Sequence, residues 1–141
     1  MPAGPTRLDD LVKSIVQSQT NIGISNPNLS EFVRFLVSSS QIHASYLSGK
    51  SPPDTDPVSL DITVVAGNSL IMVSVYPDGR VAWSRVNIRE CIGVEVENLA
   101  GLSVGTIILG SALNLRIADD SEKEGELNMF LQAVATKAWV Q

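Results

Sequence analysis

The side chains that most often perform chemistry are scarce in this chain. Its 141 residues include one histidine, His43, and one cysteine, Cys91. Nucleophilic catalysis would need Cys91 or a serine, activated by a base that a carboxylate orients. The sequence around Cys91, Arg-Glu-Cys-Ile-Gly, matches no local signature of such an enzyme, and no Gly-x-Ser-x-Gly elbow is present. We therefore expect a part-buried or surface helix histidine, a buried structural cysteine and no catalytic residues.

Carboxylates form two further groups that could carry chemistry. Glu95 and Glu97 alternate in a predicted strand and would point to the same face. Such a pair could transfer protons or help to hold a divalent cation. Because no recognisable loop supplies further oxygen ligands, a solvated sheet face is the simpler interpretation. The acidic run over residues 119–126 suits the start of a helix, where the helix dipole favours negative charge. We expect no metal and no cofactor.

One group of side chains favours the binding of a partner. Trp83, Arg85 and Arg89 occupy alternate positions along a predicted strand and would project from one face, with Asn87 between the arginines. Arg80 directly precedes this strand. Exposed tryptophan beside arginine is typical of interface hot spots, and the guanidinium fork suits a carboxylate or a phosphate. The predicted partner-binding residues are Arg80, Trp83, Arg85 and Arg89.

The same arginines also allow a purely structural interpretation. If the strands over 81–88 and 92–97 pair as a hairpin, the arginines would face Glu95 and Glu97. Opposite charges on neighbouring strands stabilise a sheet by about 0.2–1 kcal/mol per pair. The two interpretations differ in which strand lies beside residues 81–88.

Three helices are predicted from apolar spacing. The first has apolar residues at 8, 11, 12, 15 and 16, begins at the N-cap Thr6 and fades around 19–21. The second begins at Asn28, continues through 42, 46 and 47, and stops at Gly49. Ser121 and Glu124 have the spacing of a capping box for the third, whose apolar stripe runs from Leu127 to Ala138.

Between the second and third helices the chain reads as strands. Apolar and polar residues alternate strictly over 58–64, which predicts a half-buried strand. Further strands are predicted over 70–76, 81–88, 92–97, 103–109 and 111–118. Short turns such as Pro77-Asp78-Gly79 imply an antiparallel meander. The predicted fold class is α+β: two N-terminal helices, a six-stranded antiparallel meander and a C-terminal amphipathic helix. It would form a single domain over 1–141, with a helical part (1–47), a proline-rich linker (48–57) and a strand-rich part with the closing helix (58–141).

A meander followed by an amphipathic helix, over residues 58–141, resembles the pleckstrin-homology arrangement in its order of elements. The resemblance implies a partly closed sheet. It does not imply lipid recognition, because members that bind headgroups use basic residues in the first hairpin turn. Here that turn is Ala66-Gly67-Asn68-Ser69, without lysine or arginine.

Composition limits the partners. The net charge of −5 and the pI near 4.7 disfavour double-stranded nucleic acid and anionic membranes. Residues 98–115 carry no charge, but three glycines and several polar residues favour two buried strands over a membrane span. With no signal peptide visible at the N-terminus and a single cysteine, we expect a cytoplasmic location.

The sequence favours a non-enzymatic protein-interaction or scaffold module that forms homo-oligomers or binds another protein. The first helix, with its short apolar stripe, would dock on another subunit. One alternative is a carrier of a small apolar ligand, with a cavity under the closing helix lined by Leu127, Phe130 and Val134. A further alternative is an acidic chaperone or adaptor for a partner protein.

Overall fold

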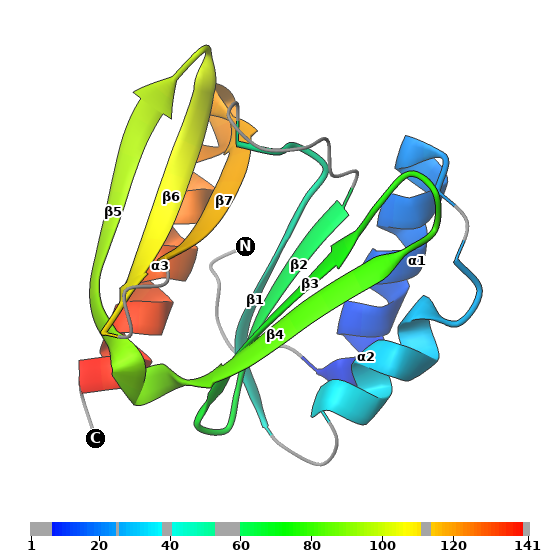
Figure 1. The fold of residues 1–141 in the computed structure, drawn as a ribbon, viewed down its shortest axis with the longest axis horizontal. Helices are drawn as coiled ribbons and strands as arrows, with labels where there is room; N and C mark the ends of the chain where they lie inside the picture. Colours follow the sequence, from blue (N-terminus) through cyan, green and yellow to red (C-terminus); the bar gives the residue numbers. More distant parts are fainter. Residues whose placement is uncertain (1–6, 25, 38–40, 53–59, 111–113, 140–141) are drawn as a thin grey trace.

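The computed structural model describes residues 7–24, 26–37, 41–52, 60–110 and 114–139, and they form an α+β fold (Figure 1). Among these described residues, two helices come first, seven strands follow, and a long helix comes last. The elements are α1 (Leu8–Ile22), α2 (Leu29–Val37), β1 (Ile42–Ser48), β2 (Leu60–Ala66), β3 (Ser69–Val75), β4 (Val81–Asn87), β5 (Cys91–Leu99), β6 (Leu102–Leu109), β7 (Asn114–Asp120) and α3 (Glu124–Trp139), with short 3-10 turns η1 (Ile88–Glu90) and η2 (Ser121–Lys123).

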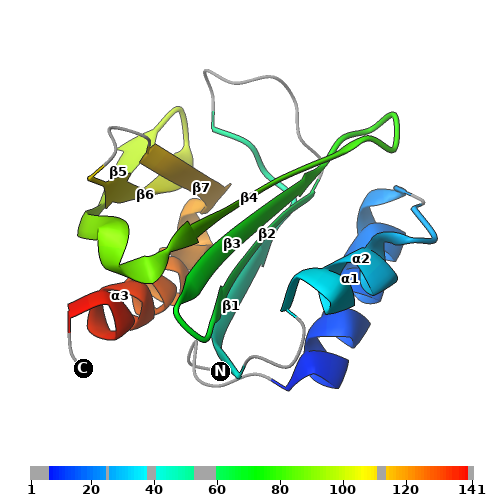
Figure 2. The same ribbon diagram turned by 60° about the horizontal axis from the view of Figure 1, so that its bottom comes forward.

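Strands β1 to β4 form an antiparallel meander, sheet A, in the order β1-β2-β3-β4. Helices α1 and α2 cover one face of sheet A (Figure 2). Leu11 and Ile15 of α1 and Val33 of α2 are buried there against Ile62 and Val73. The apolar stripe of the first helix therefore packs on the sheet of its own chain, and the docking of this helix on another subunit stays a prediction.

Strands β5 to β7 form a second antiparallel sheet, sheet B, and α3 packs between sheet B and the other face of sheet A (Figure 2). The packing on α3 is tight: a Cβ added to Gly105 of β6 would lie 2.9 Å from Cδ1 of Leu131. Sheet A is thus covered on both faces, which buries every residue of β2. Asp61 and Thr63, which alternation alone would place in solvent, are buried as well.

Side chains of β1 link the two sheets. The Tyr46 hydroxyl donates to Asp119 Oδ2 of β7 at 2.6 Å, and the Ser48 hydroxyl donates to the Ala118 carbonyl. Lys50, just past β1, forms an isolated bridge with Ala118. The sheets stay separate and do not close into a barrel. The edge of sheet A formed by β1 is therefore joined to β7, whereas β4 lies at the opposite edge (Figure 1).

The predicted α+β class is confirmed, but the single, partly closed meander of six strands is wrong, because the described strands form two separate antiparallel sheets of four and three strands. One segment is also reassigned. Residues 42–48 are the strand β1, so α2 ends at Val37, the strands number seven and the predicted helical part up to residue 47 contains a strand. Alternate residues of β1 face opposite cores, since Tyr46 packs toward α3 and Leu47 toward α1 and α2. Pairing with β2 over six residue pairs favours the strand. Half of the predicted linker (48–57), residues 53–57, lies outside the described residues.

The structure also tests the predicted helix caps and the fate of the uncharged stretch over residues 98–115. The predicted capping box at Ser121 does not form, because Glu124 accepts a hydrogen bond from Ser103 at 3.0 Å and η2 precedes α3. Thr6 lies outside the described residues. The strands predicted over 103–109 and 111–118 are found as β6 and β7, although residues 111–113 lie outside the described residues and the stretch also includes the end of β5. Within the described part of the chain, no helix is long and apolar enough to cross a membrane.

Candidate interaction surface

Strand β4 presents an open row of peptide groups. It pairs with β3 along its whole length, and no other described strand pairs with it. The Tyr76 N–H donates to the Arg80 carbonyl at 2.9 Å, and the Ile88 N–H donates to the Asn68 carbonyl at 2.8 Å. Because bonding alternates along an antiparallel pair, even-numbered residues of β4 direct their peptide groups to β3. The odd-numbered residues, Val81, Trp83, Arg85 and Asn87, direct theirs to the open edge.

Aromatic side chains flank this edge. Trp83 is 51% exposed, and its ring meets that of Phe32 on α2 edge to face, with 6.1 Å between centroids. Phe35, one turn further along α2, is 77% exposed. We call Phe32, Phe35 and Trp83 the aromatic patch. Together with Arg85 and the open peptide groups of β4 it forms the β4 surface, where exposed rings and unpaired backbone lie side by side.

The structure brings together two of the four predicted site residues. Trp83 and Arg85 share the face of β4 that looks toward α2, and Arg85 Nε donates to the Ser69 hydroxyl at 3.0 Å. Arg80 lies in the β3–β4 turn, where its Nε is 2.7 Å from Asp78 Oδ2 and its guanidinium lies over the Tyr76 ring. The charge of Arg80 is therefore engaged locally.

Arg89 does not continue the stripe of Trp83 and Arg85. It lies in η1, where its N–H donates to Asn87 Oδ1 at 2.9 Å. The strand ends at Asn87 because that side chain caps the turn. Residues 88–90 then carry the chain from sheet A to sheet B, so Arg89 belongs to the connection and not to the β4 surface.

The hairpin interpretation of the arginines is wrong. Strands β4 and β5 belong to different sheets, and β5 pairs with β6, where Glu95 lies opposite Thr106 and Glu97 opposite Val104. No cross-strand pairing with β5 therefore occupies Arg85. Within the described residues, Arg85 instead donates to Ser69 on the neighbouring strand β3.

Strand β5 shows how this chain protects an edge. Its register shifts between Cys91 and Gly93, and Glu95 and Glu97 stand exposed along it. Bulges and charges are the devices by which natural sheets avoid pairing edge to edge. Strand β4 has an unbroken register, no proline and Arg85 as its one charged residue. Of these two edges, only that of β4 lacks such protection.

Sequence reasoning missed the two phenylalanines of the aromatic patch. Phe32 falls on the apolar stripe of α2 with Leu29, Val33 and Leu36, a pattern that predicts a core residue and not a surface one. Phe35 falls off that stripe, since Leu36 and Val37 are buried while Phe35 is exposed. A large apolar residue on the polar side of an amphipathic helix was the available signal.

The single histidine and cysteine do not form an activated nucleophile. Cys91 is buried as predicted, and burial raises the pKa of its thiol, which keeps it protonated and poorly nucleophilic. His43 lies on β1, not on a helix, and burial together with the charge of Lys137 lowers its pKa. These environments suit structural roles.

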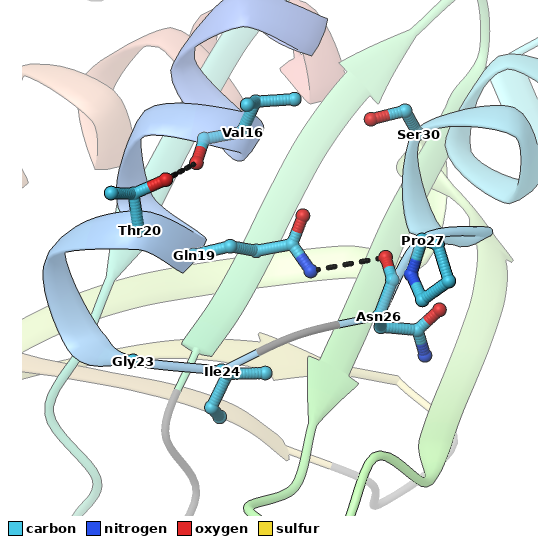
Figure 3. Close-up of a pocket in the computed structure, with 8 residues that line it drawn as sticks. All are labelled: Val16, Gln19, Thr20, Gly23, Ile24, Asn26, Pro27 and Ser30. Carbon is cyan, nitrogen blue, oxygen red and sulfur yellow. Dashed lines mark hydrogen bonds between the residues drawn. The ribbon is translucent and has the colours of Figure 1, made fainter.

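A hollow of roughly 440 Å³ lies where α1 runs into α2 (Figure 3). The Gln19 amide donates to the Asn26 carbonyl at 3.2 Å, and the Asn26 amide donates to the Gly79 carbonyl at 3.0 Å. Gly79 lies in the β3–β4 turn. The polar groups of this hollow thus fasten the α1–α2 connection to the end of β4, which fixes α2 beside the β4 surface.

The space under α3 is filled by side chains. Leu127, Phe130 and Val134, which would line a ligand cavity, are each fully buried. The Phe130 ring lies 5.8 Å from that of Tyr46, centroid to centroid. This dense packing weighs against a carrier that holds a ligand beneath the closing helix.

Comparison of the chain with protein-family models, with curated proteins and with solved structures found no match.

Proposed function

We propose that this protein is a non-enzymatic interaction module that associates with itself through the β4 surface. The observation that carries the proposal is the exposure of Trp83 and the aromatic patch beside a sheet edge without protection. An open edge is a template for a further strand, and tryptophan beside arginine is enriched among residues that dominate binding energy. An interface that buried the open edge of β4 and the aromatic patch would satisfy the peptide groups of β4 and remove the rings from water.

A cytoplasmic location belongs to the same proposal. The one cysteine is buried and unpaired, as a reducing compartment permits. Binding to a different protein, as an adaptor would require, is the second candidate, because the same open edge would accept a strand of any chain of suitable sequence.

The test is the mass of the purified protein by light scattering over a range of concentrations. We expect the mass to rise above that of one chain, and Phe35→Ala or Trp83→Ala to shift the rise to higher concentration. Met129→Ala is the matched control, because Met129 is also exposed (42%) but lies on α3, which packs on the other face of sheet A from α2. A wild-type protein that stays monomeric at high micromolar concentration would overturn the proposal.

A further inference from the structure

The peptide groups of β4 restrict how a second copy can pair with it. Only odd-numbered residues point outward, so an antiparallel partner strand must place its own outward residues opposite them. For two identical strands, this excludes a two-fold axis between residues and requires one that passes through a residue. The candidates near the middle of β4 are Trp83, Ser84 and Arg85.

Strand length and charge distinguish these axes. An axis at Ser84, the central residue of Val81–Asn87, pairs the whole strand with its copy, and any other axis shortens the ladder. It also places Trp83 opposite Arg85 of the second copy, where the guanidinium can lie against the indole. An axis at Arg85 would place like charges directly opposite each other, which destabilises a sheet.

We propose that the partner is a second copy of this chain and that the two β4 strands pair antiparallel about a two-fold axis at Ser84. This inference rests on the proposed function and specifies its geometry. The two four-stranded sheets would then form one continuous sheet of eight strands. Because the axis is perpendicular to the sheet, both aromatic patches would lie on the same face, one on each side of the axis.

Disulfide trapping tests the axis directly. Ser84 is even-numbered, so in this register it faces its own copy as a non-hydrogen-bonded pair, with about 4.5 Å between Cα atoms. That separation lies within the range of a disulfide. Ser84→Cys should therefore form a covalent dimer under mild oxidation, seen on a non-reducing gel and reversed by reductant. Because the native Cys91 is buried, the wild type serves as the control for any cross-linking through that cysteine.

Ala82→Cys is the matched control, because Ala82 lies on the same face of β4 two residues away. In the proposed register the two copies of residue 82 would be offset by four residues, about 13 Å along the strand. We expect no disulfide there. Equal cross-linking of both variants, or cross-linking of Ala82→Cys alone, would overturn the Ser84 axis.

The remaining outcomes separate the two proposals. If light scattering shows association but Ser84→Cys does not cross-link, the register falls and the proposed function stands. If the wild type is monomeric, both fall. Amide hydrogen exchange of the wild type is a second measurement that needs no variant to fold. The N–H groups of Trp83 and Arg85 should exchange more slowly as protein concentration rises, and exchange independent of concentration would overturn the pairing.

Discussion

The hydroxyl of Tyr46 donates a hydrogen bond of 2.6 Å to the carboxylate of Asp119, which lies 73 positions later in the chain. Tyr46 belongs to β1 of sheet A and Asp119 to β7 of sheet B, and both side chains are buried. Burial raises the pKa of Tyr46, and the hydrogen bond and charge of Asp119 raise it further. The hydroxyl therefore remains a donor at neutral pH, and this bond joins β1 of sheet A to β7 of sheet B.

Replacing Tyr46 with phenylalanine should destabilise the protein by about 1.5–3 kcal/mol, because a buried carboxylate loses its side-chain donor. The ring contact with Phe130 can remain, so the loss reports the hydrogen bond. Urea unfolding measures it. In a double-mutant cycle, Tyr46→Phe with Asp119→Asn should cost less than the sum of the single changes. Strict additivity would show that the two groups do not interact.

Asp61 predicts how stability depends on pH. It is buried, and burial raises its pKa to about 6, although the hydrogen bond from Ser74 acts in the opposite direction. Since the folded pKa exceeds the unfolded value near 3.9, folding favours the protonated acid. The contribution of Asp61 to stability is therefore complete below about pH 4 and is lost as the pH rises through about 6, by up to about 3 kcal/mol.

Asp61→Asn should remove this dependence, because the amide resembles the neutral acid in shape and stays uncharged. The variant should unfold at a higher denaturant concentration than the wild type at pH 7 and show little difference at pH 4. Chemical unfolding at several pH values makes the comparison. A variant that is less stable than the wild type at pH 7 would show that the ionised carboxylate is favoured in the fold.

Two glycines give opposite predictions for the same substitution. Gly105→Ala should cost about 1–3 kcal/mol, because the new Cβ would lie 2.9 Å from Leu131 and 3.3 Å from Leu127. Gly125→Ala in α3 should stabilise by about 0.5–1 kcal/mol, because its Cβ would meet nothing within 4 Å and alanine favours helix. Melting curves of the two variants measure the difference. Equal effects would mean that β6 and α3 are not in tight contact.

Arg85→Glu should weaken self-association roughly tenfold, since two contacts between Arg85 and Trp83 of the other copy would be lost. The melting temperature of the monomer should not change, because Arg85 is exposed and its hydrogen bond to Ser69 lies at the surface. Lys13→Glu is the matched control: it makes the same change of charge at an exposed site on α1. A lower melting temperature with unchanged association would assign Arg85 to stability alone.

The order of elements was largely predictable because most segments have a single periodicity. The closing helix is an example, since its stripe from Leu127 to Ala138 fits a helix and no strand. Residues 42–48 were not predictable in this way. The apolar residues Ile42, Tyr46 and Leu47 fit a helical face as well as a strand, and the pairing with β2, distant in sequence, decides between them.

Which faces are covered was harder to predict than which elements form. The alternation in β2 indicated one face in solvent, yet Asp61 and Thr63 are buried because sheet B and α3 lie over it. For the candidate site, the sequence correctly grouped Trp83 with Arg85 but gave no sign that α2 would bring Phe32 against Trp83. That contact depends on the packing of α2 on sheet A, which no local pattern encodes.

The joining of β1 to β7 limits how far assembly can proceed. A strand that paired at both edges of sheet A would let copies add without end, as in a fibre. Here the β1 edge has a register shift between Ile42 and Ala44, and just past its end Lys50 forms a bridge with Ala118 of β7. Both features hinder a further strand from pairing along β1. A copy bound at β4 therefore occupies the open edge of both chains, and growth through sheet A ends at two chains.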